Sequence, residues 1–457
     1  MEWKLYKQLQ LDSPYFEDYR QAILSKTIPW DGYARGSLIS EQEAKELTEL
    51  EKINTEESLT NFIRSNNVDN YVETLLNILG KDLSDRKDAI KYVNVLFSGF
   101  LRYDQVLTKL VELNSNDSIL KPFVKYLNHQ DEVIKLFTLF NISYLLIQND
   151  ITLSDDSIVL QTFQVLDTLI ESENFKLKQF SIELISELLS KKQYRDIFWT
   201  KNNEFVPKLF LNLNTVLNNN STNSIQFQYK ILLSIWLLTF NKEILKNFSK
   251  IYQNDLLSLL KLLKISIKEK IIRLIISILN NLTNIPNDDK NSIENLKFLI
   301  LIGNIQSIIP NLKNRKWADE ELVQDLDSLS SKIEEVFSTL TSFDEYLQEL
   351  TTKNFKNSPT HSNKEFFIDN LSKFQDSNYK IFKQLIELLN YEENDSSNFT
   401  FILNDISKIL ELDSNAITIL NSQNKKTKIM ELLNHKNSEV RYAALKATQL
   451  IVSQTFK

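Results

Sequence analysis

Apolar residues recur at helical spacing along most of the chain, and short polar runs separate the apolar segments. Residues 264–282 carry one such stripe, formed by Ile267, Ile271, Leu274, Ile275, Ile278 and Leu282. Residues 225–240 are apolar on almost every side, which is typical of a helix buried between neighbours. The pattern predicts an all-helical chain whose apolar faces pack against one another.

Two distant segments repeat one pattern. Residues 123–137 and 429–443 both give an apolar helix end, Leu-Asn-His, a polar turn and a new apolar helix. Counted from Glu132, further helices of this second kind are expected at intervals of about 42 to 50 residues, near Lys176, Gln226 and Lys268. This period is typical of armadillo and HEAT units, helical hairpins that stack because one hairpin cannot bury its apolar face alone.

Local sequence signals predict where individual helices begin and end. Residues 1–50 are predicted to form two helices separated by Pro29-Trp30-Asp31-Gly32. Ser40 and Glu43 fit a capping box at the start of the second helix, because each side chain can bond the other residue's backbone N–H. Residues 53–68 are expected to be a loop or a short helix, and residues 319–340 a long acidic amphipathic helix.

The helical spacing breaks inside residues 341–383. The run 351–354 keeps no regular period, and Pro359 removes a backbone donor and disfavours helical geometry at Ser358. Long helical patterns lie on both sides. The sequence therefore predicts two helical bodies connected by a joint.

The composition supports an all-helical fold and limits the cellular compartments in which the protein is expected. Among 457 residues there are five glycines and seven prolines, too few for the many turns of a sandwich or a doubly wound sheet. The absence of cysteine excludes disulfides and thiolate metal sites. No signal peptide or membrane-spanning run is evident, so we expect a cytoplasmic protein without direct membrane insertion. The net charge of −7, concentrated before Tyr346, disfavours nucleic acid as a partner.

No catalytic, cofactor-binding or metal-binding constellation is present in the sequence. Neither glycine-rich phosphate-binding pattern occurs, and there are three histidines. His129 and His435 occupy equivalent repeat positions, which predicts a turn-stabilising role, while His361 has no ligand partner nearby in sequence. We therefore expect no enzymatic activity and no cofactor.

Several aromatic residues lie in or next to predicted turns and are expected to be exposed there. Such residues either fill gaps between stacked repeats or anchor an interface with a partner. The residues are Trp30, Trp199, Trp317, Phe343, Tyr346, Phe366 and Phe367.

In order along nearly the whole chain, short motifs match those of one family. They include Trp30, Gly36, Ile39-Ser40-Glu41, Tyr194-Arg195-Asp196, Trp199, Gln226-Phe227-Gln228-Tyr229, residues 235–241, Lys268-Glu269-Lys270, Arg273, residues 342–346, Ser358-Pro359, His361, Asn378-Tyr379, Leu385, Asn404-Asp405-Ile406, Val440-Arg441-Tyr442 and Ala444-Leu445. With these motifs the chain resembles the H subunit of the vacuolar-type proton-translocating ATPase, in its fungal form. Two positions depart from the family, which usually has tryptophan where this chain has Asn357 and Phe367.

The resemblance implies a two-domain armadillo/HEAT-like solenoid that catalyses nothing. Residues 1–346 would be the N-terminal solenoid, 347–377 a hinge and connecting segment, and 378–457 a smaller C-terminal helical-repeat domain. It implies, as partners, the E and G subunits of the peripheral stalk, the cytosolic part of the membrane-embedded a-subunit and the catalytic/rotor sector. Expected hinge residues are Phe343, Asp344, Glu345, Tyr346, Ser358 and Pro359; possible interface residues are Phe366, Phe367, Tyr379 and Arg441.

The family's role is regulatory, on the cytosolic face of the vacuolar membrane. Its members are needed for ATP hydrolysis coupled to proton pumping in the assembled enzyme, and they inhibit hydrolysis by the detached soluble sector. The alternative is an armadillo-type adaptor that binds cargo. Adaptors of that class usually line the groove with regularly spaced tryptophans, whereas the five here, at 3, 30, 199, 236 and 317, follow no period.

Overall fold

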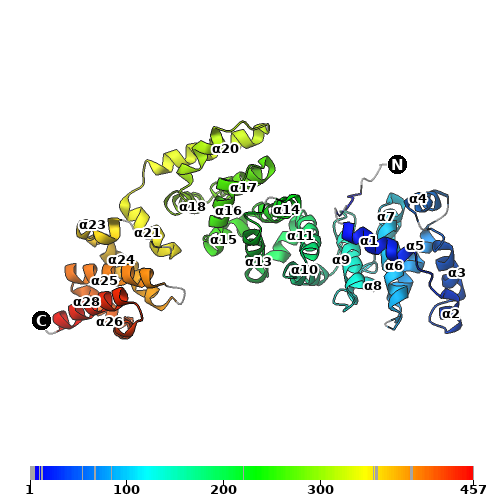
Figure 1. Cartoon of the computed structure of the whole chain (residues 1–457), viewed down its shortest axis with the longest axis horizontal. Coiled ribbons are helices and arrows are strands. Elements are labelled where there is room, and N and C mark those ends of the chain that lie inside the picture. Colours follow the sequence, from blue (N-terminus) through cyan, green and yellow to red (C-terminus); the bar gives the residue numbers. More distant parts are fainter. Residues whose placement is uncertain are drawn as a thin grey trace. The chain divides into compact units, whose positions relative to one another are not determined.

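The protein is described by a computed structural model that covers residues 6–9, 11, 14–53, 55–65, 68–83, 85–219, 221–353, 355, 359–391 and 395–455. Within these residues all regular structure is helical, so the predicted all-α solenoid class is confirmed (Figure 1). The chain divides into two compact units. One comprises Met1–Phe248 and Lys261–Asn281, and the other Ser249–Leu260 and Leu282–Lys457.

The helices of the first unit follow one another with short connections. They are α1 (Pro14–Leu24), α2 (Trp30–Arg35), α3 (Glu41–Leu50), α4 (Glu56–Ser65), α5 (Asp69–Gly80), α6 (Lys87–Phe100), α7 (Asp104–Leu113), α8 (Lys121–Val124), α9 (Glu132–Leu146), α10 (Ser157–Ile170), α11 (Phe175–Leu189), α12 (Lys192–Trp199), α13 (Asn202–Thr215), α14 (Thr222–Leu238) and α17 (Glu269–Leu282). Two further helices, α15 (Lys242–Tyr252) and α16 (Leu256–Ile265), contribute residues to both units.

The second unit combines helices of 17 or 18 residues with several short ones. They are α18 (Asp289–Leu301), η1 (Ile305–Ser307), α19 (Ile309–Lys313), α20 (Glu320–Phe337), α21 (Ser342–Thr352), α22 (Pro359–Ser362), α23 (Lys364–Asp369), α24 (Leu371–Glu387), η2 (Leu388–Asn390), α25 (Ser396–Leu412), α26 (Asn415–Ser422), α27 (Lys425–Glu431), η3 (Leu432–Asn434) and α28 (Ser438–Thr455).

The predicted repeat is confirmed in the first unit. Helices α6, α9, α11 and α14 contact one another in succession and form one layer of the stack. The repeat helices α9, α11, α14 and α17 begin at residues 132, 175, 222 and 269, which are 43 to 47 residues apart. Most of their apolar side chains are buried, and α9 and α11 each lie between two neighbours of the same layer.

Successive repeats share a second, polar contact. The hydroxyl of Tyr126 donates to the carbonyl of Leu79 at 3.3 Å, and that of Tyr194 donates to the carbonyl of Leu146 at 3.0 Å. Both carbonyls lie near the C-terminal end of a helix in the preceding repeat, where backbone acceptors lack a partner within the helix. These tyrosines therefore satisfy buried acceptors and fix the spacing between repeats.

The turn-stabilising role predicted for two histidines is also confirmed. Nδ1 of His129 accepts the backbone N–H of Asp131 at 3.0 Å, and Nδ1 of His435 accepts that of Asn437 at 3.1 Å. In each turn the residue that bonds the histidine also uses its side chain to cap the next helix. The repeated Leu-Asn-His pattern thus encodes a turn that starts a helix.

Most local predictions hold, but the helical stripe predicted over residues 264–282 is interrupted, because α16 ends at Ile265, α17 begins at Glu269 and Ile267 between them is exposed. The Ser40–Glu43 capping box is present, with bonds of 2.6 and 3.1 Å, and the acidic helix predicted after residue 319 is α20. The separator predicted at residues 29–32 is wrong, because Trp30 begins the short helix α2. Its indole is buried and donates to Glu51 at 2.8 Å, and this tertiary contact stabilises a helix that the local sequence disfavours. Residues 53–68 include a helix, α4.

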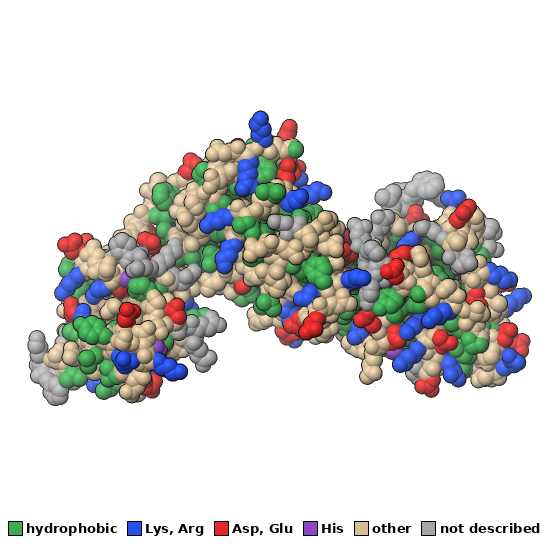
Figure 2. Space-filling model, viewed as in Figure 1, with side chains coloured by type: hydrophobic (Ala, Val, Ile, Leu, Met, Phe, Trp, Pro, Cys, Tyr) green, Lys and Arg blue, Asp and Glu red, His purple; other side chains and the backbone are tan. Residues whose placement is uncertain are grey.

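Figure 2 shows one face of the molecule, on which lysine, arginine and acidic side chains are interspersed with apolar and uncharged polar surface. Within the described part of the chain, no helix is both long enough and apolar enough to cross a membrane.

Candidate functional site

The aromatic residues of the predicted joint lie in a hydrophobic core. Phe343 and Tyr346 from α21 pack on Phe366 and Phe367 from α23 and on Phe374 from α24. The Tyr346 ring lies 5.4 to 5.9 Å from the last three. All five are buried, so the expectation that the joint aromatics are exposed is corrected. Helices α25 to α28 complete the same core, which means that α21 and α23 are integral parts of the C-terminal body.

Beside these rings, three elements meet at a buried ionic cluster. Nε2 of His361, from α22, lies 2.6 Å from Oε2 of Glu349 on α21, and Nδ1 lies 2.7 Å from Oδ2 of Asp405 on α25. The Lys408 ammonium donates to the His361 carbonyl and lies 3.7 Å from Asp405. The imidazole and both carboxylates are at most 2% exposed. Two basic and two acidic side chains therefore meet inside the body, where burial raises the pKa of Asp405 and the hydrogen bond from His361 opposes that rise.

The cluster fixes the protonation of its histidine. Burial by itself lowers the pKa of His361, but the hydrogen bonds to Asp405 and Glu349 outweigh it and raise the pKa to about 9. The imidazole is therefore a cation at neutral pH, and both ring N–H groups donate to carboxylates. It has no free lone pair for base catalysis or metal binding, so its role is to hold α21 and α22 against α25.

Sequence inspection missed this cluster because its members are far apart in the chain. His361 is 12 residues from Glu349 and 44 residues from Asp405. Asp405 lies in one of the family-like motifs, but nothing in sequence pairs it with His361. No group of His, Asp and Glu among the described residues could hold a metal ion.

Of the remaining predicted joint residues, two lie in the first turn of α21 and one begins α22. Thr341 caps α21 in a capping box with Asp344, and Asp344 also forms an ion pair with Lys297 of α18. Glu345 is half-buried in the first turn of α21. Pro359 begins α22, the first helical position, where its missing N–H costs little. Ser358 lies outside the described residues.

Of the predicted interface residues, Phe366 and Phe367 are buried and Tyr379 and Arg441 reach the surface. Tyr379 ends a left-handed turn inside α24, in which Ser377, Asn378 and Tyr379 have φ of 49°, 57° and 60°. The Tyr379 hydroxyl donates to Asp413 at 2.6 Å. Arg441 donates to the carbonyls of His435 and Lys436 at 2.8 and 2.9 Å and so supports the turn before α28.

Polar contacts link α21 to earlier segments of the second unit. Besides the Lys297–Asp344 pair, the Asn254 amide donates to the carbonyl of Thr352 at 3.2 Å. Polar contacts of this kind can exchange with water when two elements separate, unlike the apolar core on the other side of α21.

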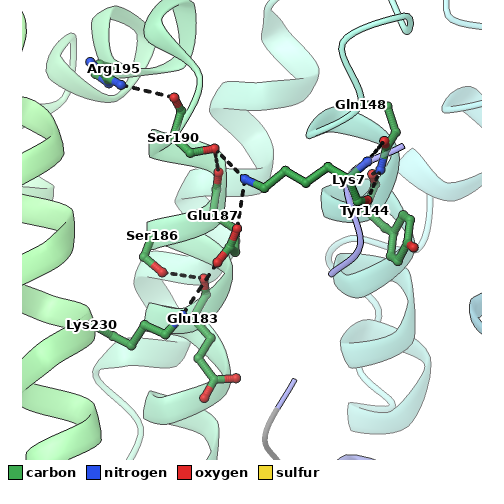
Figure 3. A network of polar contacts seen from close by, with 9 residues as sticks. All are labelled: Lys7, Tyr144, Gln148, Glu183, Ser186, Glu187, Ser190, Arg195 and Lys230. Carbon is green, nitrogen blue, oxygen red and sulfur yellow. Dashed lines mark hydrogen bonds and ion pairs between the residues drawn. The ribbon is translucent and has the colours of Figure 1, made fainter. Parts of the chain in front are cut away.

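In the first unit, an extended N-terminal segment lies on α9 and α11 (Figure 3). The Gln148 side chain accepts the backbone N–H of Lys7 at 3.0 Å and donates to its carbonyl at 2.8 Å. The Lys7 ammonium reaches Ser190 and Glu187 at 2.8 and 3.0 Å. One glutamine thus pairs with both backbone groups of a residue 141 positions away.

Comparison with known proteins finds matches along both the N-terminal and the C-terminal part of the chain. Two family models, both described as the V-ATPase H subunit, match residues 14–333 and 339–456. The chain is 25% identical to the H subunit of the V-type proton ATPase of Dictyostelium discoideum over 94% of this chain and 92% of that protein. The corresponding protein of Drosophila melanogaster is also 25% identical, over 94% and 88%.

Solved structures resemble the chain more distantly. A designed armadillo repeat protein is 14% identical, with a TM-score of 0.40 over 58% of this chain and 100% of that one. The family assignment therefore rests on the sequence matches, which together span almost all of the chain. The chain belongs to the family of V-ATPase H subunits.

Proposed function

We propose that this chain is the non-catalytic, regulatory H subunit of a vacuolar proton ATPase. In the assembled enzyme it is needed for ATP hydrolysis coupled to proton pumping, and on the detached soluble sector it inhibits hydrolysis. The observation that carries the proposal is the pair of family matches, which covers both helical bodies in order. Both ring nitrogens of His361 are hydrogen-bonded within the buried cluster, which supports a structural role for that cluster.

The proposal includes partners and location. The N-terminal solenoid binds the E and G subunits of the peripheral stalk, and the C-terminal body contacts the cytosolic part of the membrane-embedded a-subunit in the assembled pump. On the detached sector the C-terminal body contacts the catalytic/rotor parts instead. The chain acts in the cytoplasm, peripherally on the vacuolar membrane.

If the C-terminal body takes one position in the assembled pump and another on the detached sector, the chain needs a joint between its two bodies. We propose that this joint lies at residues 338–341. The expected hinge, 347–377, contains helices whose aromatic side chains belong to the C-terminal core. Helix α20 ends at Phe337 and α21 begins at Ser342, and the two family matches also part at residues 334–338. The polar Lys297–Asp344 contact is the link that would open when the C-terminal body moves.

Deletion of the gene, followed by complementation, tests the main proposal. Without the chain, vacuolar membranes should contain an assembled pump that neither hydrolyses ATP nor acidifies, and the purified chain should restore both. Normal acidification in the deletion strain would refute the proposal. Affinity purification that recovered cargo with basic motifs and no pump subunits would favour the cargo-binding adaptor instead.

A cross-link tests the joint separately. The chain has no cysteine, so Lys297→Cys with Asp344→Cys introduces the only two thiols. A short cleavable bismaleimide between them should abolish one regulatory action and retain the other, and reductive cleavage should restore both. The matched controls are the two single variants treated identically. Equal effects on activation and inhibition would contradict a two-position joint.

A further inference from the structure

Two family-like motifs that the proposed function leaves unexplained meet at one groove in the first unit. The groove has a volume of about 410 Å³ and lies between the N-terminal parts of α14 and α17. Gln226 and Tyr229 line it from α14, and Lys268, Glu269 and Lys270 line it from the start of α17. These segments are about 40 residues apart in sequence, and the repeat stacking brings them together.

The lining of the groove is mixed, and isoleucine residues lie both in the lining and just before it in sequence. Ile225 and Ile271 contribute to its lining. Next to it, the connection from α16 to α17 exposes Ile267 to 78% and Ile265 to 51%. Single exposed isoleucines are common on protein surfaces, but apolar residues that continue into a groove mark a binding surface.

The electrostatics of the groove favour a negatively charged partner. Lys268 and Lys270 line it and are exposed, Lys264 is exposed in the last turn of α16, and Glu269 is the one carboxylate among the lining residues. The lining residues Thr222 and Ile225 lie in the first turn of α14, and Glu269, Lys270 and Ile271 lie in the first turn of α17, where the helix dipoles add partial positive charge. This local basic character stands out in a chain whose net charge is −7.

We propose that this groove binds an acidic amphipathic helix of a protein partner. Leucine-like side chains of that helix fill the groove between Ile225 and Ile271 and cover Ile267, while its carboxylates pair with Lys264, Lys268 and Lys270. A helix fits because a single face can present apolar anchors with acidic residues beside them. The inference does not depend on the proposed regulatory function.

Fluorescence anisotropy with the purified full-length chain tests the proposal. The probe is a labelled helical peptide with leucines on one face and glutamates on the other. Two comparison peptides carry glutamine or lysine in place of glutamate. The acidic peptide should bind at least tenfold more tightly than either, and binding should weaken as salt is added. Tighter binding of the lysine peptide, or of a thymidine oligonucleotide, would overturn the proposal.

Variants locate the binding site. Lys268→Glu/Lys270→Glu and, separately, Ile267→Ser should each weaken binding by about tenfold, since the first reverses two ion pairs and the second removes a buried apolar contact. Matched controls in the same unit are Lys45→Glu/Lys87→Glu and Leu211→Ser, which alter exposed residues elsewhere. These controls should change affinity less than twofold. Equal losses in controls and groove variants, or no binding of the acidic peptide to the wild-type chain, would refute the site.

Discussion

Replacing His361 with glutamine should destabilise the C-terminal body in a pH-dependent way. The pKa of the imidazole is about 9 in the folded protein against an ordinary 6.5. Because the folded value is the higher one, the proton's contribution is complete below pH 6.5 and is lost as the pH rises through 9. The two values give about 3 kcal/mol at pH 6.5 and less than about 0.3 kcal/mol at pH 9.5.

Hydrogen–deuterium exchange measures this difference locally. Exchange of peptides from α21 and α25 is compared between wild type and His361→Gln at each pH, so that intrinsic exchange rates cancel. At each pH, the protection factor of wild type is divided by that of the variant. The loss of about 3 kcal/mol makes this ratio about 150-fold larger at pH 6.5 than at pH 9.5. Hydrogen bonds that the variant lacks at every pH add a constant amount to the free-energy difference from wild type. The test is therefore how this difference changes with pH.

His435→Gln is the matched control, because His435 lies in the same body and bonds a backbone N–H instead of two carboxylates. Its difference from wild type should not follow the same pH course. The reasoning would be refuted by a gap between wild type and His361→Gln that stays constant from about pH 6.5 to 9.5.

Three further substitutions test other parts of the structure. Gln148→Ala should release the N-terminal segment and reduce exchange protection of residues 6–9 by about fivefold to tenfold, since two hydrogen bonds are lost. Gly303→Ala should lower the free energy of unfolding by about 1 to 3 kcal/mol in chemical denaturation, because the new Cβ would lie 2.7 Å from the backbone carbonyl oxygen of Leu299 and would also collide with the Leu260 side chain. Ser377→Val should destabilise by about 1 to 2 kcal/mol, since a β-branched residue is strained in the left-handed turn of α24.

Each of these has a control in the chain. Gln193→Ala alters an exposed glutamine and should leave the N-terminal segment protected. Gly80→Ala, where a Cβ meets no atom within 4 Å, should be neutral or stabilising by about 0.5 to 1 kcal/mol. Ser377→Gly should not destabilise, since glycine adopts positive φ without strain. Equal effects of a test variant and its control would contradict the explanation given for that site.

Local sequence encodes the helices, their repeat and several of their ends. Helical periodicity, the Ser40–Glu43 capping box and the histidine turns depend on residues within a few positions of one another. Contacts of this kind form within short segments, so they could be predicted without knowing which helices are neighbours. The ordered family motifs likewise indicated the family.

In contrast, the tertiary arrangement of the helices decides which aromatic side chains are buried and which residues far apart in sequence form hydrogen bonds. An aromatic residue beside a turn looks the same in sequence whether it is exposed or, like Phe367, fully buried. The partners of His361 and Gln148 lie 44 and 141 residues away, and the groove beside Ile267 forms between separate repeats. Contacts over such distances depend on how the hairpins stack, and an apolar stripe specifies that a helix is covered without specifying what covers it.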